Sequence, residues 1–219
     1  MDHSTIISSK NTSLPPSSRL RRPPMTSFIS STEVDRTVVG HNNSGSVSLP
    51  CLVIKAVFFL IGEKVDKNPD IVRRIVEEGH IVANHTYSHS GLFPLSGKGK
   101  VMQELQKCGE SIKNAIGRYP LLFRPPFGAT NPIIGRAVNA QGLKTIGWSI
   151  RSLDTVDGKT RAEILRKVEA KLHPGAIILL HDRCAKSDEL LESIIESALN
   201  RNYSFIPLDK MLKIDVYEN

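Results

Sequence analysis

Apolar residues recur with two different periods from about residue 54 onward. Short apolar runs bounded by Gly, Pro or polar residues predict strands, and stretches with an apolar residue every three or four positions predict helices. The predicted strands are 57–61, 80–83, 121–123, 144–150, 176–180 and 204–207. The predicted helices are 69–78, 101–116, 132–141, 161–172, 187–200 and 208–212. Repeated strand–helix units of this kind predict an α/β fold with parallel strands and right-handed crossovers.

Several helix ends carry local signals of their own. Pro69 stands at the first position of a predicted helix, and Gly79 follows its end. Thr160 and Glu163 have the spacing of a capping box at the start of a later helix. The run 176–180 is apolar throughout, as expected of a strand that is buried on both faces.

Residues 1–53 differ from the rest of the chain in composition. They are rich in Ser, Thr, Pro and Asn and show neither a helical period nor sustained alternation. Such a segment cannot bury enough apolar surface to fold alone, so we expect it to be disordered or foreign to the fold. Residues 54–219 are then expected to form one folded domain.

Targeting signals are weak. The N-terminus lacks the apolar core of a secretory signal, so a cytoplasmic protein is expected by default, or an extracytoplasmic one if the true N-terminus is missing. No apolar run approaches the roughly 20 residues that a membrane-spanning helix needs, so no membrane span is expected.

The chain is basic, with a formal net charge of +7 and a pI near 9.4. Its basic residues are spread over predicted helices, where a solvated face is the usual explanation. Four Tyr and one Trp leave few aromatic side chains for stacking bases, so we expect no nucleic-acid partner. A mildly basic surface could equally favour an anionic cell-wall polymer. Three cysteines without CxxC spacing argue against a disulfide framework and against a cysteine zinc site.

Two histidines, His85 and His89, follow the apolar run 81–83. If the chain turns into a helix there, both imidazoles lie on one face and can reach a single cation. Imidazole pairs suit zinc and neighbouring transition metals. The alternative is two polar residues at a strand end, each hydrogen-bonded or solvated. The HxxxH pattern alone is short and produces many false matches.

Three further segments favour the metal interpretation, because each lies at or just after an apolar run: 123–128, 148–155 and 178–182. Functional side chains at successive strand ends are how α/β barrels build a site. The ordered motifs HTxxH, RPPFG, WxxRSxDT and LLHD resemble the polysaccharide deacetylase family, whose catalytic unit is the chitooligosaccharide-deacetylase homology domain. The resemblance covers about residues 54–213 and implies an irregular (β/α) barrel of about seven strands.

The resemblance also implies an activity, namely metal-dependent hydrolysis of acetyl groups on N-acetylated or O-acetylated polysaccharide. The divalent metal is expected to be zinc, with cobalt, nickel or manganese as alternatives. By this resemblance, His85 and His89 are metal ligands, His181 is the catalytic acid, and Asp154 is the partner of His181. Arg124 orients the catalytic base, and the backbone N–H of Phe127 donates to the oxyanion. Trp148 and Leu179 form the walls of the acetyl pocket.

Each of these residues also has a structural interpretation. His181 fits a strand-end histidine that bonds a backbone carbonyl, and Asp154 fits a turn aspartate. By pattern alone, Trp148 and Leu179 are equally ordinary core residues.

One element of the family is missing from this sequence. The family opens with a Thr-Phe-Asp-Asp-Gly-Pro motif, which supplies the general base and the third metal ligand, and this chain has no Asp-Asp pair. The barrel is therefore expected to lack or replace its first strand, and the chain to be weak or inactive unless another carboxylate, such as Asp35, serves.

The alternatives are thus a catalytically inactive carbohydrate-binding relative, a truncated fragment, or a basic surface-binding protein without an active site. Chitin fragments, peptidoglycan, poly-N-acetylglucosamine and acetylated xylan all remain open as the polymer.

Overall fold

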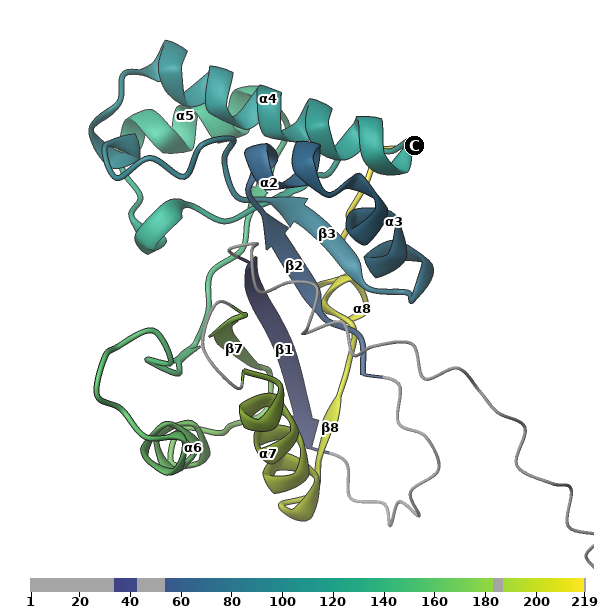
Figure 1. Cartoon of the computed structure of the whole chain (residues 1–219), viewed down its shortest axis with the longest axis vertical. Coiled ribbons are helices and arrows are strands. Elements are labelled where there is room, and N and C mark those ends of the chain that lie inside the picture. The colour runs from purple at the N-terminus through teal and green to yellow at the C-terminus, as the bar shows by residue number, and fades with distance from the viewer. Residues whose placement is uncertain (1–33, 43–53, 183–186, 219) are drawn as a thin grey trace, which may run out of the picture.

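The structure is a computed structural model that describes residues 34–42, 54–182 and 187–218 (Figure 1). Its strands are β1 Val34–Asn42, β2 Val57–Leu60, β3 Ile81–Asn84, β4 Leu122–Phe123, β5 Lys144–Thr145, β6 Ile150–Arg151, β7 Ala176–His181 and β8 Tyr203–Phe205. The α-helices are α2 Gly62–Lys67, α3 Pro69–Glu77, α4 Lys98–Ile116, α5 Pro132–Ala140, α6 Arg161–Glu169, α7 Ser187–Asn200 and α8 Leu208–Leu212, and the 3₁₀ turns are η1 Phe93–Leu95 and η2 Pro126–Gly128.

The strands form one sheet in the order β5-β4-β3-β2-β1-β7-β6, with β8 pairing β1. Pairs β2–β3, β3–β4, β4–β5 and β6–β7 are parallel, as the strand–helix alternation predicted. The chain between β5 and β6 passes from one edge of this sheet to the other. The architecture is an irregular α/β barrel, which confirms the predicted fold class.

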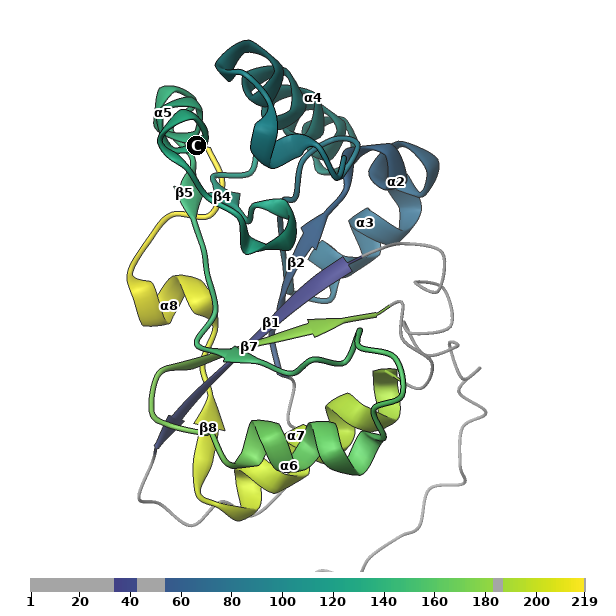
Figure 2. The same ribbon diagram turned by 90° about the vertical axis from the view of Figure 1, so that its left-hand side faces the viewer.

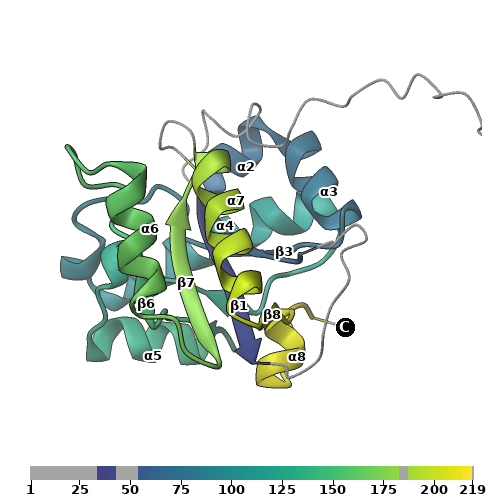
Figure 3. The same ribbon diagram turned by 90° about the horizontal axis from the view of Figure 1, so that it is seen from below.

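The helices cover the outside of the sheet in two groups. Helices α2 to α5 lie on the side of β2 and β3, whereas α6 and α7 lie side by side over β7 (Figures 2 and 3). None of the helices in the described part of the chain is long and apolar enough to span a membrane.

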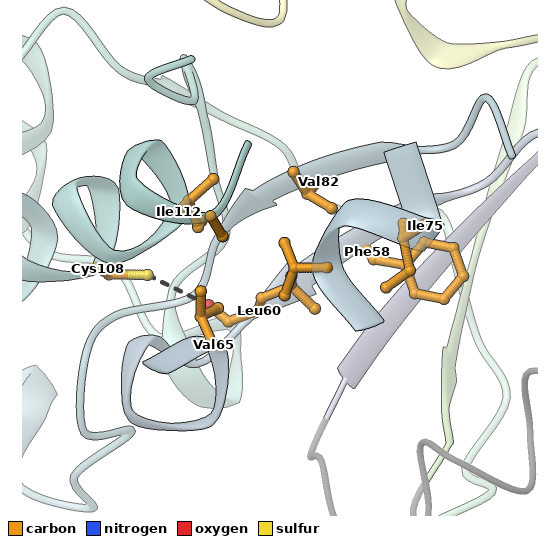
Figure 4. Close-up of a cluster of buried hydrophobic side chains, with 9 residues drawn as sticks. Phe58, Leu60, Val65, Ile75, Val82, Cys108 and Ile112 are labelled. Atoms are coloured by element: carbon orange, nitrogen blue, oxygen red, sulfur yellow. Dashed lines mark hydrogen bonds between the residues drawn. The ribbon is translucent and has the colours of Figure 1, made fainter. Parts of the chain in front are cut away.

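Alternate residues of β2 and β3 separate an outer core from an inner one. Phe58, Leu60 and Val82 face α2, α3 and α4 in the outer cluster, where the thiol of Cys108 donates a hydrogen bond to the carbonyl of Leu60 (Figure 4). Val57, Phe59, Ala83 and Leu122 belong to the inner cluster, together with Leu208 of α8. Both faces of these strands are buried, as their continuous apolar runs require.

Strand β1 was not expected from the hydrophobic pattern. It lies between β2 and β7 and runs antiparallel to both, and the backbone of Asp35 is paired with Phe59 on one side and His181 on the other. A segment of residues 1–53 thus occupies the gap between two parallel groups of strands. Residues 1–33 and 43–53 lie outside the described residues.

Two predicted boundaries are wrong. The predicted strand 57–61 is followed at once by a helix that was not predicted, because Gly62 starts α2; a Cβ on Gly62 would lie 2.5 Å from Cδ2 of Tyr87. The predicted strand 144–150 is interrupted after β5, because the carbonyls of Ile146 and Gly147 accept hydrogen bonds from the guanidinium of Arg124 rather than from a neighbouring strand. The other differences move element ends by one to three residues.

Candidate active site

His85 and His89 lie on a loop after β3, and the helix expected there is not formed. Thr86 and His89 have positive φ values of 68° and 50°, which a helix excludes. The loop nevertheless places the two imidazole rings together, with centroids 4.9 Å apart and an angle of 52° between their planes. The two imidazole rings are therefore brought together by a loop and not by the expected helix.

Buried polar side chains hold this loop in place. The carboxylate of Glu104, on α4, accepts hydrogen bonds from the backbone N–H groups of Tyr87 (3.1 Å) and Ser88 (2.8 Å) and from the hydroxyl of Ser88. The amide of Asn84 donates to the carbonyl of Leu105 at 2.7 Å and accepts from the N–H of Thr86 at 2.9 Å. Neither Glu104 nor Asn84 was predicted from the sequence to hold this loop. For Glu104, the available signal was an acidic residue on the apolar side of a helix.

The tautomer of His85 follows from one contact. Its Nδ1 lies 2.7 Å from the carbonyl oxygen of Arg124, and since a carbonyl only accepts, Nδ1 carries the proton. Nε2 is then the nitrogen with a lone pair. Burial, reinforced by the charge of the neighbouring His89, lowers the pKa of His85 to about 3. A neutral imidazole with its other nitrogen bonded to a carbonyl is the usual state of a metal-binding histidine.

The donor set fits a metal only in part. His85 and His89 supply two adjacent imidazoles, but within the described residues no group of three or more His, Cys, Asp or Glu side chains gathers. A catalytic zinc is usually held by three protein ligands.

His181 ends β7, and Asp154 lies on the loop after β6. One carboxylate oxygen of Asp154 lies 2.8 Å from Nδ1 of His181, and the other accepts the backbone N–H of His181 at 2.6 Å. Burial raises the pKa of Asp154, but hydrogen bonds from His181 and Ser152 outweigh burial and hold that pKa below its usual value. An ionised carboxylate beside Nδ1 stabilises the protonated imidazole and keeps Nε2 available for proton transfer.

Arg124 is fully buried behind the site. Its Nε donates to the carbonyl of Ile146 at 3.0 Å and its Nη2 to that of Gly147 at 2.9 Å. The guanidinium also stacks 4.0 Å from the ring centroid of Phe59 and lies 5.5 Å from that of Trp148. Arg124 thus fixes the chain that leads into Trp148.

The turn after β4 brings Phe127 and Gly128 to the site, both with positive φ. The Phe127 ring is 65% exposed and lies 5.1 Å from that of His89. A Cβ on Gly128 would lie 2.2 Å from Cη2 of Trp148, so only glycine allows the indole to pack there.

One pocket of about 180 Å³ unites these parts. We call its first side, His85, His89, Pro125 and Phe127, the histidine wall, and its second side, Arg151, Thr155, Leu179 and His181, the acid wall; Gly128 and Trp148 join the two. Asp154 and Arg124 do not line it but contact lining residues from behind. Sequence reasoning did not single out Pro125, Gly128, Arg151 or Thr155, although all four lie inside the recognised motifs.

The comparisons with known proteins agree with this arrangement. The polysaccharide deacetylase family profile matches residues 49–146. The peptidoglycan-N-acetylglucosamine deacetylase PgdA of Listeria monocytogenes is 32% identical over 160 residues, covering 72% of this chain and 33% of that protein. This chain therefore spans about a third of the length of that relative.

Solved structures are similar as well. A CE4 family pseudoenzyme from Bacillus anthracis is 28% identical, with a TM-score of 0.67 over 73% of this chain and 56% of that one. A polysaccharide deacetylase from Bacillus cereus is 30% identical, with a TM-score of 0.65, and the match covers 75% of this chain and 84% of that one. With the fold, the motifs and this coverage in agreement, the chain belongs to the polysaccharide deacetylase family.

Proposed function

We propose that this protein is a metal-dependent hydrolase that removes acetyl groups from N-acetylated polysaccharide. The observation that carries the proposal is the convergence of His85 and His89 with the His181–Asp154 pair on one small pocket. Paired imidazoles and a carboxylate-bound histidine are the groups that amide hydrolysis requires, namely a site for a Lewis acid and a proton donor.

His85 and His89 would hold the divalent ion, with zinc as our first candidate. A bound ion of this kind supplies positive charge that polarises the acetyl carbonyl and lowers the pKa of a nearby water. The backbone N–H of Phe127 donates to the developing oxyanion, while Trp148 and Leu179 enclose the acetyl methyl group.

His181 acts as the general acid in this proposal. Water adds to the acetyl carbon, the C–N bond breaks, and the leaving nitrogen takes the proton from Nε2 of His181. Asp154 keeps that proton available, because its carboxylate stabilises the imidazolium and holds the ring through Nδ1. Acetate and a free amine are the products.

The base that takes the proton from the attacking water is the open part of the site. Asp35 is our candidate, because the backbone register of β1 sets it opposite His181, at the site end of β7. The same carboxyl group is the candidate third ligand, since carboxylate oxygen completes many two-histidine zinc sites.

The test is acetate release from N-acetylated chito-oligomers and from peptidoglycan glycan strands, with bound metal measured on the same samples. We expect wild-type protein to retain a divalent ion and to release acetate, and the His85→Ala/His89→Ala double variant to lose both. Asp35→Asn is expected to lower acetate release about 10²–10⁴-fold if Asp35 is the base. Equal rates in wild type and both variants would overturn the proposal.

A second candidate is a carbohydrate-binding relative without catalysis. It is favoured by the presence of only two adjacent imidazoles among the described residues and by the likeness to a pseudoenzyme. Glycan binding without acetate release, at saturating zinc, would support this candidate.

A further inference from the structure

Two arginines lie near the pocket, and they differ in burial and in hydrogen bonding. Arg124 is fully buried and bonded to carbonyls, whereas Arg151 is exposed and lines the pocket, and its guanidinium forms no hydrogen bond or ion pair with the described residues. Its backbone is paired with Leu179, the wall of the acetyl pocket. Arg151 therefore offers five N–H donors to whatever occupies the pocket mouth.

No acidic side chain is found beside Arg151 among the described residues that line the pocket. Asp154 is the carboxylate behind this wall, but its side chain is 1% exposed and bonded to His181.

Further cations lie beside Arg151 on the α6 side of the molecule. Desolvation, together with the positive charges of Lys171, Lys159 and Arg151, lowers the pKa of Lys167. Arg151 thus lies near enough to Lys167 for their charges to interact, and these cations add to the positive potential on this side of the molecule. Two exposed acidic residues, Asp157 and Glu163, also lie close to these cations in the sequence, and Glu163 is bonded to Thr160 in the capping box.

We infer that Arg151 selects the substrate, by binding a carboxylate carried by the N-acetylated glycan close to the acetyl group that is removed. This inference rests on the proposed function, because the carboxylate is read in the pocket where deacetylation would occur. A planar guanidinium matches a carboxylate with two parallel hydrogen bonds, which a neutral sugar hydroxyl does not offer. The preferred substrate class is therefore an acidic N-acetylated glycan rather than neutral chitin.

Two sources of the carboxylate fit the pocket: an acidic ether substituent on the acetylated sugar itself, or a uronic acid in the adjacent sugar. Binding is measured by calorimetry with the full chain for oligosaccharides of both kinds, each beside the same oligosaccharide with its carboxylate converted to the neutral carboxamide. The source whose acidic form binds more tightly than its carboxamide identifies the position of the anion.

We expect wild-type protein to prefer the acidic form by about tenfold, the effect of one charge-assisted contact. Arg151→Gln should remove that preference, measured as the ratio of the two affinities within the same protein. Arg151→Lys should retain part of it, because the charge remains but the two-pronged geometry is lost. Added salt should weaken binding of the acidic form only.

The matched control is Arg136→Gln, because Arg136 is exposed on α5 and does not line the pocket. Its preference should equal that of wild type. No preference in wild type, or a preference that survives Arg151→Gln, would overturn the inference.

Acetate release from the same ligands separates the two proposals. Release without an acidic preference leaves the proposed function intact and overturns the role of Arg151. An Arg151-dependent preference without any release supports the role of Arg151 in binding and counts against catalysis.

Discussion

The histidine wall and the acid wall of the pocket are built by different means. On the acid wall, His181 ends a regular buried strand, and a single carboxylate, that of Asp154, binds both its backbone N–H and its ring. On the histidine wall, His85 and His89 lie on an irregular loop with two positive φ values, held by Glu104 of α4, the next α-helix in the chain. Both walls depend on contacts between elements, but the acid wall is anchored on a regular strand, whereas the histidine wall has an irregular backbone that side chains of other residues hold in place.

The two walls lie on different elements of the fold, the histidine wall after β3 and β4 and the acid wall on and after β6 and β7. Damage to one wall should therefore be separable from damage to the other, both in metal binding and in stability.

The largest separation is expected in catalysis. His181→Ala should lower acetate release about 10²–10⁴-fold, because the leaving nitrogen loses its proton donor. Bound metal should be unchanged, since His181 is not one of the two paired imidazoles. The measurement is acetate release beside metal content, with His173→Ala, an exposed histidine outside the pocket, as the control. A fall in metal content would show that the two walls share the ion.

The second test measures how the histidine wall contributes to the free energy of unfolding. Glu104→Ala leaves two partly buried N–H groups without their acceptor, and an unpaired donor away from water costs about 1–3 kcal/mol. We expect the free energy of unfolding in urea to fall by about 2–4 kcal/mol, and the loop with His85 to lose order. Glu110→Ala, an exposed glutamate on the same helix, should change it by less than about 0.5 kcal/mol. An equal loss in both variants would mean that Glu104 does not hold the loop.

The pH dependence of stability is the third test. The pKa of His85 is about 3 in the folded protein and about 6.5 when unfolded, so only the unfolded state takes up this proton between those values. Stability from neutral His85 is therefore present above about pH 6.5 and is lost as pH falls toward 3.

Between pH 7 and pH 5, His85 should cost the wild type about 2 kcal/mol of unfolding free energy that His85→Gln does not lose. Urea unfolding at both pH values, with chelator present to remove metal, gives the comparison. Parallel pH profiles for the two proteins would mean that His85 is protonated in the folded state.

The sequence predicted the acid wall better than the histidine wall. A buried apolar run ending at His181 needs no distant contact to be recognised, and the position of His181 at the end of β7 follows from it. The HxxxH pair was given the right proximity but the wrong geometry, because the loop conformation depends on Glu104 and Asn84.

The elements that were missed depend on long-range contacts in the same way. Strand β1 pairs with β2 and β7, and the hydrophobic pattern within residues 34–42 does not predict these pairings. The break in the predicted strand 144–150 is caused by Arg124, a residue from another strand end.

The last test concerns Gly128 and Trp148, the two residues between the walls. Gly128→Ala places a Cβ 2.2 Å from Cη2 of Trp148 and keeps a positive φ that costs a side-chain-bearing residue about 1–2 kcal/mol. The indole must move, and since Trp148 is the only tryptophan of the chain, its fluorescence reports that movement directly.

Gly135→Ala is the matched control, because nothing lies within 4 Å of its added Cβ and alanine in a helix stabilises by about 0.5–1 kcal/mol. We expect opposite changes in unfolding free energy for the two variants and an altered emission spectrum for Gly128→Ala alone. Identical spectra with equal stabilities would mean that the indole of Trp148 does not pack against Gly128.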